Sequence, residues 1–402
     1  MNRTIALTIA GCLSASSMLQ AQQFDNAASA QLGGFDLVPT IDIGFRHDDN
    51  ITRSANDAIS SWSRIVSPQL VLRNAFSASE ARFGYRLRNE TFFSSSQDNY
   101  TDHFLFAGVD FELNARHRLD ISLNYADEHE ARGTGFSTGS AATLTEPDQF
   151  KQSDFLAIYS YGAFNAKGRF DLTLQLTNRD YDLDTAVYQA RDRRLNTIGG
   201  TFFYRVGATT DLTFDAEYTD VTYPFALNPE NPLDSQVSSY LIGLDWEATA
   251  NTSGFAKIGY EQKLFESAQR EDFSGVDWAV GLEWEPTEYA SVELSTRADT
   301  TETNGEGDFI RSRTNRIAWK HDWLERLRTQ VSYAWSDNLY EAQETTLALR
   351  DDDNQRLRVS SYYAFRRWLN FELSFIRDQR DSNRDIIIYD RNQWLLNAYI
   401  TL

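Results

Sequence analysis

The sequence predicts an all-β protein, a transmembrane antiparallel up-and-down β-barrel of about 18 strands (16–18), with long external loops and short periplasmic turns. Two observations predict this fold. Apolar and polar residues alternate with period two along most of the chain, and short connections between these segments alternate with long ones. Period-two alternation gives a strand one apolar and one polar face. Regular alternation of short and long connections is typical of outer-membrane barrels.

The first 21 residues have the layout of a secretory signal peptide. Arg3 precedes an apolar stretch that ends near Leu13, and small residues lead to Ala21, where cleavage is expected. The residues before Cys12 also fit lipid attachment at that cysteine, an alternative that requires an unusually short leader. We expect the following domains: signal peptide 1–21, short periplasmic N-terminal segment 22–36 and barrel 37–402.

Composition excludes several classes of protein. Cys12 is the only cysteine, so a chain cleaved after Ala21 has no disulfide and no thiolate metal site. The net charge is −20, and it becomes −21 without residues 1–21, which argues against a nucleic-acid partner. Aromatic and hydrophobic contents of 13% and 41% argue against disorder. A mean hydropathy of −0.49, with no long apolar run after the leader, excludes transmembrane helices but not a barrel.

The alternating segments are strand candidates. In the stretch 211–220, Leu212, Phe214 and Tyr218 alternate with acidic and hydroxyl side chains. Three segments, near 62, 194 and 310, alternate poorly. We expect strands of about ten residues, beginning near residues 37, 62, 81, 102, 118, 151, 169, 194, 211, 236, 254, 272, 290, 310, 328, 355, 369 and 388.

The connections and the aromatic residues also favour a membrane. Short connections lie at 114–118, 165–169, 207–211, 249–253, 286–289 and 366–370, and long ones at 127–150, 182–193, 222–235, 338–354 and 377–388. Tryptophans adjoin the short turns, as an interfacial aromatic girdle requires: Trp246, Trp284, Trp323 and Trp368. The last ten residues place Trp394, Leu396 and Ile400 on one face, with Leu402 at the end and Asn397 where glycine is common in terminal barrel strands.

Polar side chains on the strands are expected to face the lumen, because a charge facing lipid costs about 2–4 kcal/mol near the midplane. Phe104, Phe106, Asp110 and Lys257 share this parity. The remaining candidates form the predicted lumen set: Asp42, Arg82, Arg86, Arg88, Glu112, Asp120, Asp171, Asp215, Glu217, Asp245, Glu283, Glu293, Arg358, Tyr362 and Glu372.

No enzymatic constellation is visible, and no cofactor is expected. The five histidines (His47, His103, His117, His129 and His321) fall at strand ends, in turns or in loops, and no hydrolase, nucleotide or metalloprotease motif is present. A phospholipase on the outer wall remains an alternative. Three acidic clusters, at 48–50, 127–130 and 351–354, are placed in external loops. They are expected to be solvated, the alternative being divalent cations that bridge to lipopolysaccharide.

The opening stretch LVPTIDIGFRHDDNI and the closing stretches VSSYYAFRRWLNFELSFIRDQRDSN and YDRNQWLLNAYITL carry a resemblance. With Pro39, Asp48 and Pro68, they resemble the outer-membrane β-barrel porins of type 2, which are often encoded with exopolysaccharide or capsule synthesis. The resemblance covers nearly the whole chain after the leader. It implies export of an exopolysaccharide or capsular polysaccharide through the outer membrane, with periplasmic export proteins, lipopolysaccharide and the barrel-assembly machinery as partners.

Two alternatives remain open: a passive porin for small solutes, and a structural or surface barrel with a plugged lumen. A barrel of this size would leak if nothing narrowed it. We therefore expect the loop at 127–150 or the loop at 338–354 to fold inward as a constriction.

Overall fold

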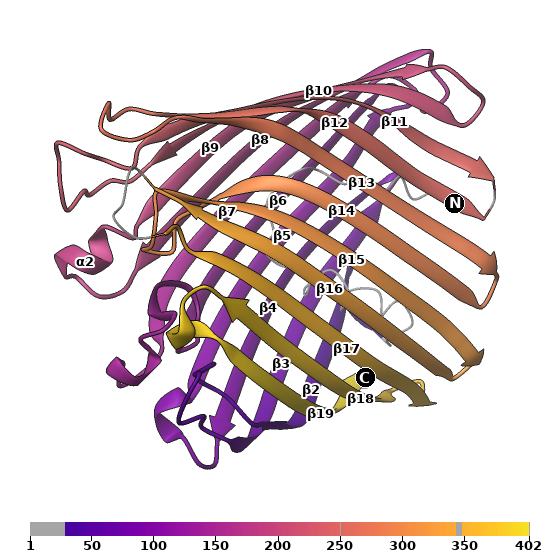
Figure 1. Cartoon of the computed structure of the whole chain (residues 1–402). Coiled ribbons are helices and arrows are strands. Elements are labelled where there is room, and N and C mark those ends of the chain that lie inside the picture. Colours follow the sequence, from indigo (N-terminus) through magenta and orange to yellow (C-terminus); the bar gives the residue numbers. More distant parts are fainter. Residues whose placement is uncertain (1–28, 250, 343–347, 402) are drawn as a thin grey trace.

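The computed structural model describes residues 29–249, 251–342 and 348–401. A short strand, β1 (Ala30–Leu32), pairs with the start of the first wall strand. Eighteen longer strands form the wall (Figure 1): β2 (Phe35–Asp48), β3 (Ser61–Phe76), β4 (Ser79–Phe92), β5 (Tyr100–Asn114), β6 (His117–Glu130), β7 (Asp148–Tyr161), β8 (Gly168–Tyr181), β9 (Arg193–Arg205), β10 (Thr210–Thr222), β11 (Ser235–Thr249), β12 (Thr252–Phe265), β13 (Phe273–Thr287), β14 (Ala290–Glu302), β15 (Phe309–Leu324), β16 (Leu327–Glu341), β17 (Asp351–Arg366), β18 (Leu369–Ser382) and β19 (Tyr389–Thr401).

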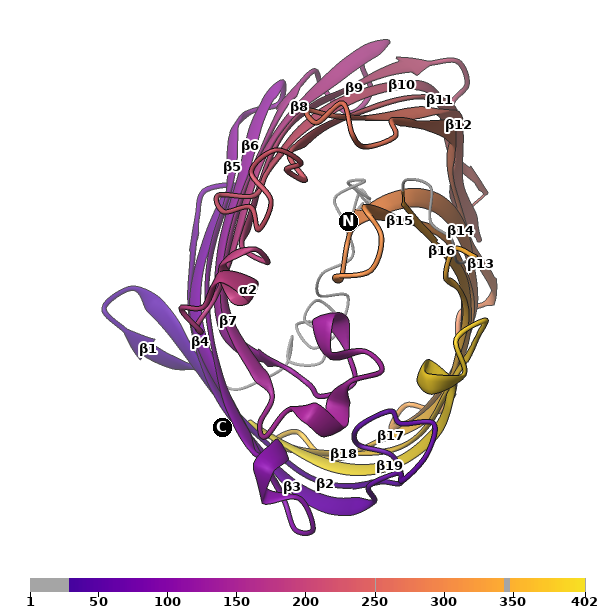
Figure 2. The same cartoon turned by 60° about the vertical axis from the view of Figure 1, so that its left-hand side comes forward.

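The wall is a closed ring. Each strand from β2 to β19 runs antiparallel to the next, and β19 returns to pair with β2 from Gln393 opposite Asp48 to Thr401 opposite Thr40. Figure 2 shows the ring close to end-on. Closure leaves no edge strand along this seam, as a sheet in hydrocarbon requires. The predicted all-β transmembrane barrel of about 18 strands is therefore confirmed.

Strand positions agree with the sequence, but strand lengths do not. Every wall strand begins within four residues of its expected start, yet the strands contain 13 to 16 residues rather than about ten. The extra residues lie at the polar ends, where alternation fades beyond the apolar band. Asp48, Asp127–Glu130 and Asp351–Asn354 consequently belong to strands, so their placement in loops was wrong.

Connections at the two ends of the ring differ in length, as predicted. At one end, called the turn end, most contain two residues and the longest contains six. The opposite, loop end carries longer connections, of which six enter the argument: L1 (49–60), L2 (93–99), L3 (131–147), L4 (182–192), L7 (303–308) and L9 (383–388). L4 contains the short helix α2 (Ala186–Gln189), and L3 contains 3-10 turns at Gly135–Ser137 and Ala141–Thr143.

Apolar side chains cover the outside of the barrel instead of filling a central core. Leu174, Ile258 and Trp284 are 42%, 59% and 49% exposed, and the outer face of the strands is rich in such residues. A buried hydrophobic cluster lies at the loop end, formed by Ile51, Phe92 and Tyr100. This arrangement positions a polar interior inside an apolar wall, with loop packing confined to one mouth.

Candidate functional site: the lumen and its mouth

Strand register assigns each wall residue to one of two faces, because residues paired across neighbouring strands point to the same side of a sheet. Gln69, Arg86 and Phe104 are opposite one another on β3, β4 and β5. The L3 segment lies inside the ring in Figure 2. Its Phe136 packs against Tyr181 with ring centroids 5.7 Å apart, and Tyr181 lies on this same face. The face is therefore the lumen side. Pairing around the ring places the whole predicted lumen set on it: Asp42, Arg82, Arg86, Arg88, Glu112, Asp120, Asp171, Asp215, Glu217, Asp245, Glu283, Glu293, Arg358, Tyr362 and Glu372.

Some members of this set are ion-paired with neighbours on the wall. Arg358 Nη2 lies 2.8 Å from Glu372 Oε1, and Glu372 also accepts hydrogen bonds from Ser374 and Tyr399. Lys257 lies 3.0 Å from Asp215, and Arg316 lies 2.8 Å from Glu293. The Arg358–Glu372 and Arg316–Glu293 pairs join adjacent strands, and Lys257–Asp215 reaches across β11 from β12 to β10, so these contacts brace the wall. The set is spread around the lumen and does not converge on one point.

Charge on the lumen wall is segregated by arc. Basic side chains gather on β4, where Arg86 also lies 4.4 Å from the centroid of the Phe104 ring. Acidic side chains gather on β10 to β13, including Glu217, Glu261 and Asp277. β4 and β13 are nine strands apart in either direction around the ring, so the two arcs face each other across the lumen. The main cluster of arginines and the main cluster of carboxylates therefore lie on opposite sides of the lumen.

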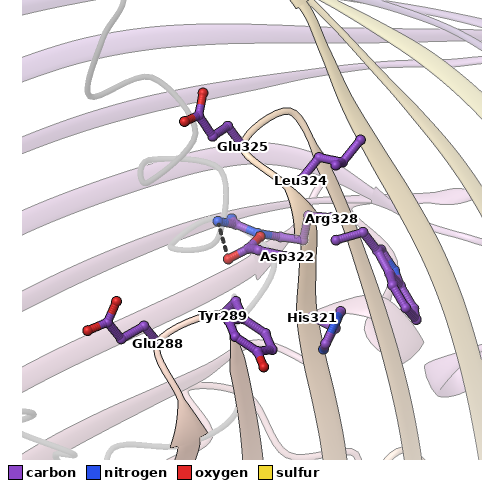
Figure 3. Close-up of a pocket in the computed structure, with 8 residues that line it drawn as sticks. Glu288, Tyr289, His321, Asp322, Leu324, Glu325 and Arg328 are labelled. Carbon is purple, nitrogen blue, oxygen red and sulfur yellow. Dashed lines mark hydrogen bonds and ion pairs between the residues drawn. The ribbon is translucent and has the colours of Figure 1, made fainter.

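A cavity of about 510 Å³ lies at the turn end, between the β13–β14 and β15–β16 turns (Figure 3). Asp322 and Arg328 form an ion pair of 2.6 Å within it. The His321 ring lies 4.2 Å from the Trp323 ring and 5.3 Å from the Tyr289 ring, measured between centroids. Clustered aromatic rings at this end fit the interfacial girdle expected from the sequence, and the cavity is a shallow rim feature.

A buried ion pair fixes L3 at the loop end. Arg132 donates from Nε to Asp98 Oδ1 at 2.8 Å and from Nη2 to Asp98 Oδ2 at 2.7 Å, joining L3 to L2. Its Nη1 also donates to the carbonyl oxygens of Ala141 and Leu144 at 3.4 and 3.2 Å, which holds the two ends of L3 together. The Arg132 and Asp98 side chains are 3% and 4% exposed. A single side chain thus both shapes L3 and attaches it to the barrel.

The β14–β15 hairpin bends into the lumen at the loop end. β13 and β14 pair only as far as Trp278 opposite Ala298, whereas β14 and β15 stay paired to Glu302 opposite Phe309. The detached tip lies on the lumen side of the wall near β10 and β12. There Glu302 accepts hydrogen bonds from Tyr223, directly after β10, at 2.8 Å and from Lys263 of β12 at 2.6 Å. Lys263 is fully buried by this contact. In Figure 2 this orange hairpin end projects into the ring.

L3 and L7 meet across the mouth. A Cβ built on Gly305 of L7 would lie 3.0 Å from Cδ1 of Phe136 in L3, so the two loops are in direct contact. Arg350, directly before β17, binds Glu306 of L7 at 3.1 Å. On the other side of L3, Gly139 lies against Ile387 of L9. The mouth is therefore narrowed by loops that contact one another, while the wall below them is lined with polar side chains.

The seam between the first and last wall strands contains polar residues whose roles were missed in the sequence. Arg391 donates from Nη2 to Asp48 at 2.5 Å, and the amide of Gln393 donates to Asp48 at 2.9 Å. Asn392 donates its backbone and side-chain N–H groups to Asp49 at 2.6 and 2.9 Å. The first acidic cluster is thus satisfied by β19, which leaves no need for a bridging cation. The only sequence signal for this pairing is the run Asp-Asp-Asn at 48–50 near the start of the barrel and the run Asp-Arg-Asn at 390–392 near its end.

Two further properties concern only the part of the chain that the structure describes. None of its helices is long and apolar enough to cross a membrane. Across the same residues, no group of three or more histidine, cysteine or acidic side chains is arranged to hold a metal ion.

A family model described as "Putative beta-barrel porin 2" matches residues 26–401, which is nearly the whole chain. The chain belongs to this family. This porin is accordingly an outer-membrane β-barrel channel, a transport fold and not an enzyme. Because short turns are periplasmic in outer-membrane barrels, we expect its turn end to face the periplasm. The resemblance found in the opening and closing stretches is confirmed. A search of curated proteins found no match.

Solved structures support the fold of this porin. The Pseudomonas aeruginosa OpdK structure with vanillate is 10% identical, with a TM-score of 0.50 over 93% of this chain and 100% of that one. The apoprotein form of the FrpB iron transporter from Neisseria meningitidis is 12% identical, with a TM-score of 0.51 over 90% of this chain and 63% of that one. At these identities the likeness concerns the barrel alone.

Proposed function

We propose that this porin carries a secreted polysaccharide outward across the outer membrane, and that L3 and L7 close its mouth until the polymer or a partner displaces them. The observation that supports the proposal is the combination of a wide ring with a mouth narrowed by loops. A ring of eighteen strands is wide enough for small solutes to pass through its lumen. Loops that touch one another across the opening restrict passage until they move.

The lumen wall below the mouth suits a hydrated polymer. Carboxylates, guanidinium groups and amides line it, and Phe104 and Phe106 add aromatic faces on β5. Sugar rings pack on such faces and exchange hydrogen bonds with such polar groups. Proposed partners are lipopolysaccharide around the loop end, periplasmic export proteins at the turn end, and the barrel-assembly machinery, which would read the terminal strand β19.

Deleting the gene tests export directly. Surface polysaccharide should disappear while precursor accumulates behind the outer membrane, and expression of the intact gene should restore secretion. The purified porin should conduct weakly in planar bilayers, because its mouth is narrowed. Normal polymer secretion by the deletion strain, together with the conductance of a general porin, would replace export by the passive-porin alternative. A barrel that stays closed even without its loops would instead be structural.

A further inference from the structure

A cavity of about 170 Å³ lies at the loop end, where L1, L2 and L3 meet the wall beside the β2–β19 seam. Three arginines line it: Arg46 of β2, Arg53 of L1 and Arg391 of β19. Phe92 and Tyr100 supply aromatic surface on the same lining. The lining of the cavity thus combines three guanidinium groups with aromatic rings.

The three arginines differ in whether a carboxylate binds them. Arg391 binds the fully buried Asp48 at 2.5 Å, and Arg46 binds the fully buried Glu90, also at 2.5 Å. Arg53 forms no ion pair with any residue that the structure describes, and its Nη1 makes one long hydrogen bond, 3.5 Å, to the Ile51 carbonyl oxygen. Burial and the neighbouring Arg391 lower the pKa of Arg53, whereas the Asp48 carboxylate raises that pKa. The carboxylates near Arg53, those of Asp48 and Asp378, are ion-paired with Arg391 at 2.5 and 3.5 Å instead.

L1 holds Arg53 in this position with a defined turn. Arg53 has a φ of +50°, a left-handed conformation that is uncommon for a residue with a side chain. Asn50 stabilises the turn, because its amide donates to Ser54 O at 3.0 Å and its Oδ1 accepts from Ser54 N at 3.0 Å. The same amide donates to Asp390 O across the seam at 3.1 Å. The backbone thus fixes Arg53 against the wall.

We propose that this cavity binds one anionic sugar unit of the polymer, with its carboxylate on Arg53 and its ring beside Tyr100. Guanidinium and carboxylate pair through two parallel hydrogen bonds. The Tyr100 ring is already stacked on His129, with centroids 3.6 Å apart, so it presents a fixed surface. Asp98, which anchors L3 through Arg132, also lines the cavity. A bound anion therefore lies next to the contact that holds the mouth closed.

The inference rests on the proposed function in that it assigns the ligand to an acidic polymer. Isothermal titration of the intact purified porin with D-glucuronate, glucose and inorganic phosphate tests it. We expect glucuronate to bind and glucose to bind at least tenfold more weakly. Arg53→Gln should weaken glucuronate binding at least tenfold, a loss of about 1.4 kcal/mol, and Arg53→Lys should retain part of it. Arg116→Gln, at an exposed turn-end arginine, should bind as the unchanged porin does.

Three results would overturn the site: unchanged glucuronate affinity in Arg53→Gln, equal affinity for glucose, or phosphate binding as tight as glucuronate. Heat-modifiable migration of each variant shows whether it is folded. A short oligoglucuronide separates a polymer unit from a free sugar acid: binding at least as tight as the monomer supports the assignment, and exclusion of the oligomer overturns it. Because binding is measured on purified protein, its failure is distinguishable from a deletion strain that still secretes polymer.

Discussion

Replacing Arg132 with alanine tests whether a buried ion pair keeps L3 in the mouth. The change removes both hydrogen bonds to Asp98 and those to the two L3 carbonyl groups, and it leaves Asp98 buried without its cation. Removing one partner of a buried pair costs about 3–5 kcal/mol. Because L3 can relieve this cost by leaving its site, the balance between closed and open mouths should shift by about a hundredfold to a few thousandfold. The mean conductance of Arg132→Ala in planar bilayers should therefore rise well above that of the unchanged porin.

Lys151→Ala is the matched control, since it breaks another ion pair at the loop end. Lys151 lies 2.8 Å from Asp182, but the two side chains are 45% and 37% exposed. Such exposed pairs contribute about 0–1 kcal/mol, so its conductance should stay unchanged. The double variant Arg132→Ala with Asp98→Ala removes the unpaired charge. Its rise in conductance over the unchanged porin should be smaller than the sum of the rises in the two single variants. Folded Arg132→Ala that conducts like the unchanged porin would refute the role of the pair.

Three further predictions follow from the wall and the seam. Removing residues 132–147 should raise single-channel conductance, and an unaltered current would show that L3 does not restrict the mouth. Leu174→Arg places a charge on the lipid face at a cost of about 2–4 kcal/mol and should impair assembly. Gln175→Arg, on the lumen face, should assemble and shift ion selectivity toward anions. Equal loss of assembly in both variants would mean that the strand register is wrong. Asp48→Ala leaves Arg391 buried without its close carboxylate and should lower the temperature of heat-modifiable migration, unlike Asp390→Ala, whose side chain is 66% exposed.

The wall could be predicted because its alternation is enforced along every strand by lipid on one side and water on the other. Strand positions and lumen parity follow from that contrast, as Leu174 and Gln175 illustrate. Strand ends could not be predicted, since beyond the apolar band both faces are polar. Asp351–Asn354 therefore looked like a loop although it begins β17.

The period-two alternation of residues does not predict contacts between segments that are distant in the sequence. The sequence indicated that a long loop narrows the mouth, but the partner of Arg132 lies in L2 and the tip of the β14–β15 hairpin enters from the other side. Asn397 stands where glycine is common in terminal strands, and the structure gives a reason: its side chain occupies the space above Gly44, where a Cβ would lie 2.1 Å from Asn397 Oδ1. Such a compensation needs the paired strand to be known.

The β2–β19 seam also has a consequence for biogenesis. Arg391 and Asp48 are 343 positions apart in the sequence, so a nascent barrel carries Asp48 without its guanidinium partner until the last strand arrives. Contacts of such separation form late, because the chain between them must be ordered first. A chain truncated before β19 has neither the ladder nor this ion pair and leaves β2 as an unsatisfied edge. Ring closure therefore depends on the last strand, which supplies both the ladder and the ion pair that β2 requires.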